Sequence, residues 1–177
     1  MPYGGGMTTH ADGQQKTKEP APSHARQWLA AVLLAAVFGT ILLITMWPAP
    51  VDKGYSGSID RLVGVLHRNG VPNWFGYNGL EFTANILMFI PLGFLVALLL
   101  TQRLWWLALI ICPAFSVLIE LTQAVFLAAR FATVSDVISN STGAFIGIFV
   151  AVLIRAAVYQ RDQKVIARAF WQREASR

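Results

Sequence analysis

The chain has 177 residues, of which 55% are hydrophobic and only 13% are charged. This composition is too apolar for an ordinary soluble domain, and an uncharged run over residues 28–47 excludes a soluble helical domain by its length. The net charge of +5 is spread along the chain without any nucleic-acid-binding motif, so no nucleic-acid partner is expected. The predicted fold class is therefore all-α, as a polytopic membrane protein.

The first residues, 1–27, are rich in Gly, Thr, Gln and Pro, which predicts a disordered cytoplasmic arm. The segment 28–47 then contains no charged residue and would be about 30 Å long as a helix, the thickness of the hydrocarbon core. Because it runs into Pro48-Ala49-Pro50 without a cleavage site, it is interpreted as an uncleaved signal anchor.

The first loop contains apolar residues at helical spacing: Ile59, Leu62, Val63 and Leu66. Ser58 is a candidate N-cap and Gly70 a candidate stop signal. The pattern predicts a short interfacial helix on the outer face of the membrane.

Three further apolar segments have the length of a spanning helix: 82–101, 104–126 and 137–158. The turn 101–103 is so short that the second and third spans must form an antiparallel hairpin. The first span and these three form a predicted four-helix transmembrane domain over 28–158. Pro91 and Pro113 lie inside spans, where local kinks are expected.

The last segment, 159–177, alternates basic and apolar residues, which predicts a basic amphipathic helix on the anionic cytoplasmic leaflet. Its basic residues include Arg161, Lys164 and Arg168, and its apolar residues include Val165, Ile166, Ala169 and Phe170.

Lys and Arg counts predict the orientation, because cytoplasmic flanks carry the excess of positive charge. With the N-terminus inside, ten basic residues are cytoplasmic and four are outside, namely Lys53, Arg61, Arg68 and Arg130. The tryptophans fall at or just beyond span ends, where the indole ring prefers to sit. The prediction is a multi-pass plasma-membrane protein with both termini in the cytoplasm, in contact with membrane lipids.

Polar residues recur at the outer ends of these apolar spans: Glu81, Asn85, Glu120, Gln123, Arg130, Asp136 and Asn140. Hydrocarbon tolerates such groups poorly, so they indicate either a functional site or a polar lock between helices. The pairs within one helix are three or four residues apart and share a face, so the predicted topology brings the set together.

Arg130 is the only cation in this set, against the carboxyl groups of Glu81, Glu120 and Asp136. Full ionisation would leave two excess negative charges in a poorly solvated place. A protonated carboxyl, a bound cation or a ligand with a positive group would compensate, and Glu120 is the best candidate for the neutral acid because it lies deepest. In the alternative interpretation the set only cross-links helices, and Asp136 is the N-cap of the fourth span.

Small residues and one proline are assigned to helix packing rather than chemistry: Pro91, Gly93, Gly143 and Gly147. Gly143 and Gly147 form a G-x-x-x-G pattern with Ser139 one step earlier, which permits close approach of another helix. That helix belongs either to the same chain or to a second copy, so a homo-oligomer through Gly143 and Gly147 is one expectation.

The sequence resembles the VanZ-like family of bacterial membrane proteins over roughly residues 45–155. The matching segments are Glu81-Phe82-Thr83-Ala84-Asn85, Phe89-Ile90-Pro91-Leu92-Gly93, Glu120-Leu121-Thr122-Gln123, Arg130, and Asp136 through Asn140 to Gly143. The resemblance implies a cell-envelope membrane protein, and in the founding example it implies resistance to the antibiotic teicoplanin. It supplies no catalytic residues.

Three functions follow as hypotheses. The first is a non-enzymatic protein whose outer-leaflet polar site binds an amphiphile, either a lipid-linked wall precursor or a lipoglycopeptide. The second is an intramembrane enzyme acting on a phospholipid or polyprenyl phosphate, with Glu120 or Asp136 as acid or base, although no histidine or nucleophile motif accompanies them. The third is a small transporter or channel subunit that uses Glu120. No cofactor or metal is expected, since the single cysteine, Cys112, has no metal-type spacing.

Overall fold

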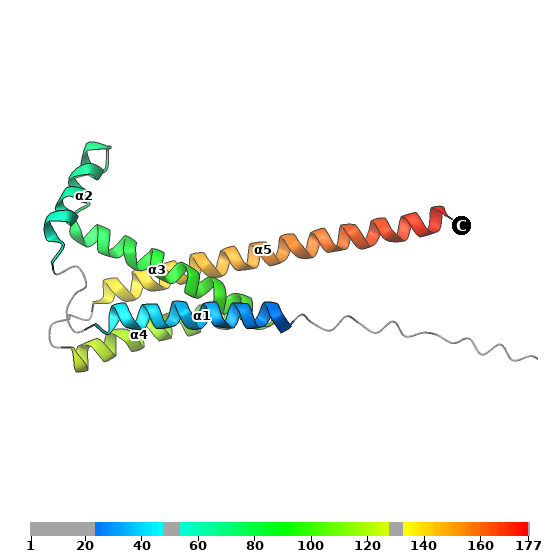
Figure 1. The fold of residues 1–177 in the computed structure, drawn as a ribbon, viewed down its shortest axis with the longest axis horizontal. Coiled ribbons are helices and arrows are strands. Elements are labelled where there is room, and N and C mark those ends of the chain that lie inside the picture. Colours follow the sequence, from blue (N-terminus) through cyan, green and yellow to red (C-terminus); the bar gives the residue numbers. More distant parts are fainter. Residues whose placement is uncertain (1–23, 48–53, 128–132, 177) are drawn as a thin grey trace, which may run out of the picture.

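The regular elements in the described part of the chain are all helices. The computed structural model describes residues 24–47, 54–127 and 133–176. The elements in these ranges are α1 (His24–Thr45), α2 (Ser56–Arg68), α3 (Tyr77–Leu99), the 3₁₀ turn η1 (Trp105–Leu107), α4 (Ala108–Phe126) and α5 (Val134–Ala175). Figure 1 shows α1, α3, α4 and α5 packed side by side, with α2 standing apart from them.

Within the described ranges, four helices are long and apolar enough to cross a membrane. They are α1, α3, α5 and the continuous unit of η1 with α4. The predicted all-α fold is therefore confirmed, and four candidate spanning helices are present, as the sequence predicted. We call the end of the bundle where α1 and α4 end and α3 and α5 begin the polar end. The opposite end, where the α3–η1 turn lies, is the turn end (Figure 1).

Glycines hold α3 and α5 in backbone contact. A Cβ atom built on Gly147 would lie 2.0 Å from the carbonyl oxygen of Ile90, and one on Gly143 would lie 2.1 Å from that of Ile86. Gly93 of α3 makes the reciprocal approach to the carbonyl of Ala144. The glycine stripe thus packs against α3 of the same chain, and a homo-oligomer would have to use another face.

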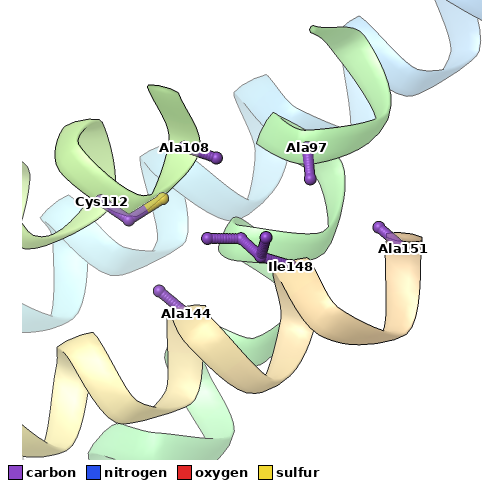
Figure 2. Packing of buried hydrophobic residues seen from close by; sticks show 6 residues of the cluster. All are labelled: Ala97, Ala108, Cys112, Ala144, Ile148 and Ala151. Carbon is purple, nitrogen blue, oxygen red and sulfur yellow. The ribbon is translucent and has the colours of Figure 1, made fainter. Parts of the chain in front are cut away.

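Small side chains extend this close packing toward the turn end. In Figure 2, Ile148 of α5 lies among short side chains of α3, α4 and α5. The buried cluster consists of Ala97, Ala108, Cys112, Ala144, Ile148 and Ala151. Cys112 is a buried member of this cluster, as expected of a small hydrophobe.

Helix α2 begins earlier than its predicted cap. Ser58 is not the N-cap, because the helix starts at Ser56 after Tyr55, and the amide of Ser58 already donates to the carbonyl of Tyr55 at 2.9 Å. Gly70 does end the helix: it has φ +95°, and the amides of Gly70 and Val71 donate back to the carbonyls of His67 and Leu66. This is the Schellman arrangement, which needs a left-handed residue that glycine provides. No residue of α2 is buried, and its interfacial placement stays a prediction.

Helix α5 continues past the predicted end of the fourth span at residue 158 and runs unbroken to Ala175. At 1.5 Å per residue it is about 63 Å long, roughly twice the hydrocarbon thickness. The basic tail is therefore a continuation of the span rather than a separate element, and Figure 1 shows it extending beyond the other helices.

Arg155 of α5 caps the carboxyl end of α3. Its Nη2 donates to the carbonyl oxygens of Leu98 and Leu100, at 2.5 and 2.7 Å. The last carbonyls of a helix have no partner inside the helix, and a nearby cation satisfies them both by hydrogen bonding and through the helix dipole. From the sequence, Arg155 was only one of the ten basic residues whose positions predicted the cytoplasmic side.

We expect Arg155→Leu to lower the free energy of unfolding by about 1.5–3 kcal/mol, because two charge-assisted hydrogen bonds are lost and their carbonyls stay in a poorly hydrated place. Arg161→Leu is the matched control, since Arg161 is exposed two turns further along α5. Reversible unfolding in mixed micelles of increasing SDS content measures the free energy of unfolding of both variants. Equal stability of the two variants would contradict a capping role for Arg155.

Candidate functional site

The polar residues meet where α3, α4 and α5 converge at the polar end, and the start of α5 explains part of their arrangement. Thr133 has extended backbone angles, φ −124° and ψ 142°, and its Oγ1 accepts from the amide of Asp136 at 3.1 Å. Thr133 is therefore the N-cap, and the interpretation of Asp136 as N-cap is wrong. Helix α5 begins one turn earlier than that interpretation assumed, so Asp136 occupies the third helical position.

Glu120 completes this cap from another helix. In a capping box the acidic side chain at the third helical position accepts from the amide of the N-cap residue. Here the amide of Thr133 donates instead to Oε2 of Glu120 of α4, at 3.0 Å. The Glu120 side chain is only 7% exposed, so a buried carboxyl group fastens the start of α5 to α4.

Since Glu120 fills the capping position, the carboxylate of Asp136 faces α3. The Nδ2 of Asn85 donates to Oδ1 of Asp136 at 2.9 Å. Asp136 and Asn85 are both half-buried, so this pair lies at the edge of the bundle and not in its core. The carboxylate of Asp136 can consequently be reached from outside.

Gln123 joins α4 to α1. Its Nε2 donates to the carbonyl oxygen of Thr45 at 2.8 Å, and both residues are buried. Thr45 is the last residue of α1, so its carbonyl has no partner within the helix. Gln123 thus closes the end of α1, and all four spanning helices are hydrogen-bonded at the polar end.

Asn140 lies one turn deeper than Asp136 on α5, and it is 3% exposed. Its Nδ2 donates to Oγ of Ser116 at 3.0 Å, and Ser116 is fully buried. The Oδ1 of Asn140 is buried without a hydrogen-bond partner among the residues that the structure describes. An unpaired buried acceptor costs about 1–3 kcal/mol, and native proteins contain few of them.

We call the set formed by Asn85, Ser116, Glu120, Gln123, Asp136 and Asn140 the polar layer. Of the other predicted site residues, Glu81 is exposed one turn before Asn85 on α3, and Arg130 lies outside the described residues. In residues 24–47, 54–127 and 133–176, no group of three or more His, Cys, Asp or Glu residues gathers that could hold a metal ion.

Three partners in or around the polar layer were not singled out from the sequence: Thr45, Ser116 and Thr133. Thr133 carried a signal, because Thr133-Val134-Ser135-Asp136 has the spacing of a capping box. Ser116 lies one turn before Glu120 on the same face of α4, which also indicated a role. Thr45 contributes only its backbone carbonyl, which no sequence pattern identifies.

A comparison with protein-family models finds a match to the family VanZ/LLP1 over residues 28–155, well over half of the chain. The matched region starts in α1 and ends at Arg155, so it includes α3, α4, most of α1 and the first half of α5, with the polar layer and the cap on α3. Neither a curated protein nor a solved structure shows a significant match.

Proposed function

The chain belongs to the VanZ/LLP1 family of membrane-spanning proteins, and we propose that its polar layer binds the head group of an amphiphile. The proposed ligand is a lipid-linked wall precursor or a lipoglycopeptide antibiotic with a lipid tail. The proposed setting is the bacterial plasma membrane, with the polar end toward the outer leaflet and both termini in the cytoplasm.

The observation that carries the proposal is the unpaired Oδ1 of Asn140. The hydrogen bonds between helices in the polar layer would suffice if its only role were to hold the helices together. That role does not require a buried acceptor without a donor. A ligand hydroxyl, amide or ammonium group would supply that donor. Water is excluded from hydrocarbon, so a hydrogen bond from that donor to Asn140 would contribute more binding free energy here than at a protein surface.

The second support is the position of Asp136 above Asn140. Residues four apart on a helix have Cβ atoms about 5–6 Å apart, so two acceptors lie one above the other on α5. The upper acceptor, Asp136, is half-exposed, and the lower one, Asn140, is buried. A head group with several donors, such as a sugar or an amine, could engage Asp136 first and then Asn140.

The surroundings support an amphiphile over a water-soluble ligand. The polar layer is flanked on its lipid-facing sides by exposed apolar residues, including Leu121 and Ile138. A ligand with a polar head and a long apolar tail would keep its tail in the bilayer while its head enters the polar end.

Susceptibility of a deletion strain to teicoplanin, with vancomycin and detergents as comparisons, tests this function in cells. We expect wild type to complement a teicoplanin-selective defect, and Arg130→Ala and Glu120→Gln to fail at matched membrane levels. Arg61→Ala, a change on exposed α2, serves as the control that should complement. Full complementation by both site variants would reject a working site and leave a scaffold.

A further inference from the structure

A second site lies in the other half of the bundle, apart from the polar layer. Near the turn end, α1, α3 and α4 leave an apolar cavity of about 420 Å³. Its lining includes two short side chains of α1, Ala31 and Ala35, together with larger ones such as Leu99 of α3 and Ile111 of α4. Any role of this cavity is independent of the proposed function, which concerns the opposite end of the molecule.

The cavity extends from the middle of the bundle to the turn end and is partly open, because several of its lining residues are exposed, namely Ala31, Ala35, Phe38, Leu99 and Ile111. At the end nearer the middle of the bundle, the rings of Phe38 and Phe115 stack with centroids 4.8 Å apart. Leu92 and Leu99, both in its lining, are seven residues apart on α3, so the cavity extends about 10 Å along that helix. Leu99 is the last residue of α3, so the cavity reaches the level of the turn.

The material that fills this space must come from the bilayer. The lining residues belong to helices that are long and apolar enough to cross a membrane, so hydrocarbon surrounds them. A water molecule needs two to four polar partners, and this lining of aliphatic and aromatic side chains offers only the weakly polar thiol of Cys112. If the cavity were empty, its lining side chains would lose dispersion contacts. An apolar chain would restore these contacts.

A charged residue and aromatic residues near the turn end of the cavity indicate the kind of lipid. Arg103 follows Leu99 by four residues in the turn, and its side chain is exposed. Trp28 and Trp106 are exposed at the same end of the bundle, where indole rings mark the head-group level. A guanidinium group at this level attracts and binds lipid phosphate.

We propose that this cavity binds one acyl chain of an anionic phospholipid, whose phosphate group is held by Arg103. The lipid stands between α1 and the α3–α4 hairpin and takes the place of side-chain packing that Ala31 and Ala35 do not provide. It is a bound lipid of the leaflet at the turn end, distinct from the ligand of the polar layer.

Native mass spectrometry of the delipidated full-length protein in detergent micelles, titrated with dioleoyl phosphatidylglycerol or dioleoyl phosphatidylcholine, tests the proposal. We expect wild type to bind one phosphatidylglycerol tightly per monomer. Ala35→Phe fills the cavity and should weaken that binding at least ten-fold. Ala36→Phe, the same change on an exposed neighbour outside the lining, should stay within two-fold of wild type.

A second variant tests the head-group contact without touching the membrane-spanning packing. Arg103→Gln should reduce phosphatidylglycerol affinity to that of phosphatidylcholine, whereas Arg68→Gln on α2 should leave the preference unchanged. Wild-type binding by Ala35→Phe would overturn the proposal, and so would an unchanged lipid preference in Arg103→Gln. A dimer that dissociates in Ala35→Phe would also overturn it, because a second copy would then cover the cavity.

Discussion

Gly147→Leu should destabilise the bundle severely, lowering the free energy of unfolding by about 3 kcal/mol or more. A Cβ atom at this position would lie 2.0 Å from the carbonyl oxygen of Ile90 and 2.7 Å from the amide nitrogen of Phe94. Both neighbours are backbone atoms of α3, so no rotamer change relieves the overlap. The two helices must separate, and the contacts along their whole interface weaken together.

Gly39→Leu is the matched control for this prediction. Gly39 lies inside α1, and a Cβ atom there meets nothing within 4 Å. Its substitution should be neutral or slightly stabilising, because leucine has a higher helix propensity than glycine. Reversible unfolding by SDS in mixed micelles, followed by circular dichroism, compares the two variants. If Gly147→Leu unfolds at the same SDS fraction as Gly39→Leu, the backbone contact between α3 and α5 does not exist in the membrane.

The double variant Asn140→Leu with Ser116→Ala should separate binding from stability. It removes the unpaired Oδ1 of Asn140 together with the donor and acceptor of one buried hydrogen bond. Replacing both partners by apolar groups of similar shape is nearly neutral, and a membrane hydrogen bond contributes only about 0.6 kcal/mol on average. We therefore expect unfolding within about 1 kcal/mol of wild type, with complementation of the teicoplanin defect lost.

A structural lock predicts the opposite pattern for the same double variant. If the polar layer only held helices together, a variant as stable as wild type would keep its function. Val152→Leu, a similar apolar change at a half-buried position of α5 away from the polar layer, controls for the substitution itself. Full complementation by a stable double variant would contradict ligand binding at Asn140.

The sequence predicted the spans and their meeting point because both depend on strong local signals. Strongly apolar stretches of membrane length located α1, α3, α4 and the first half of α5. The alternating direction of successive spans brought the polar residues to one end. The sequence also predicted that Gly143 and Gly147 pack closely against another helix, although only the fold showed that this helix is α3. Gly70 ended α2 as expected, since the left-handed conformation needed at that position is one that few residues other than glycine adopt.

The remaining details depended on contacts between distant residues. The role of Asp136 stayed open between N-cap and cross-link, because that choice depends on Glu120, which occupies the capping position from another helix. Arg155 looked like one more cytoplasmic charge, and its role appears only when α5 passes the carbonyls of Leu98 and Leu100. The length of α5 was missed because the tail carries charges that end a membrane span but do not end a helix.

Ligand capture at the polar layer tests the central proposal most directly. A diazirine amino acid placed at Val137, half-buried one turn from Asn140, would be irradiated in living cells and the adduct mass measured. We predict one discrete adduct with the mass of an amphiphile, absent when Asn140→Leu and Ser116→Ala are present. Adducts of bulk phospholipids that are the same with and without the double substitution would contradict a head-group site in the polar layer.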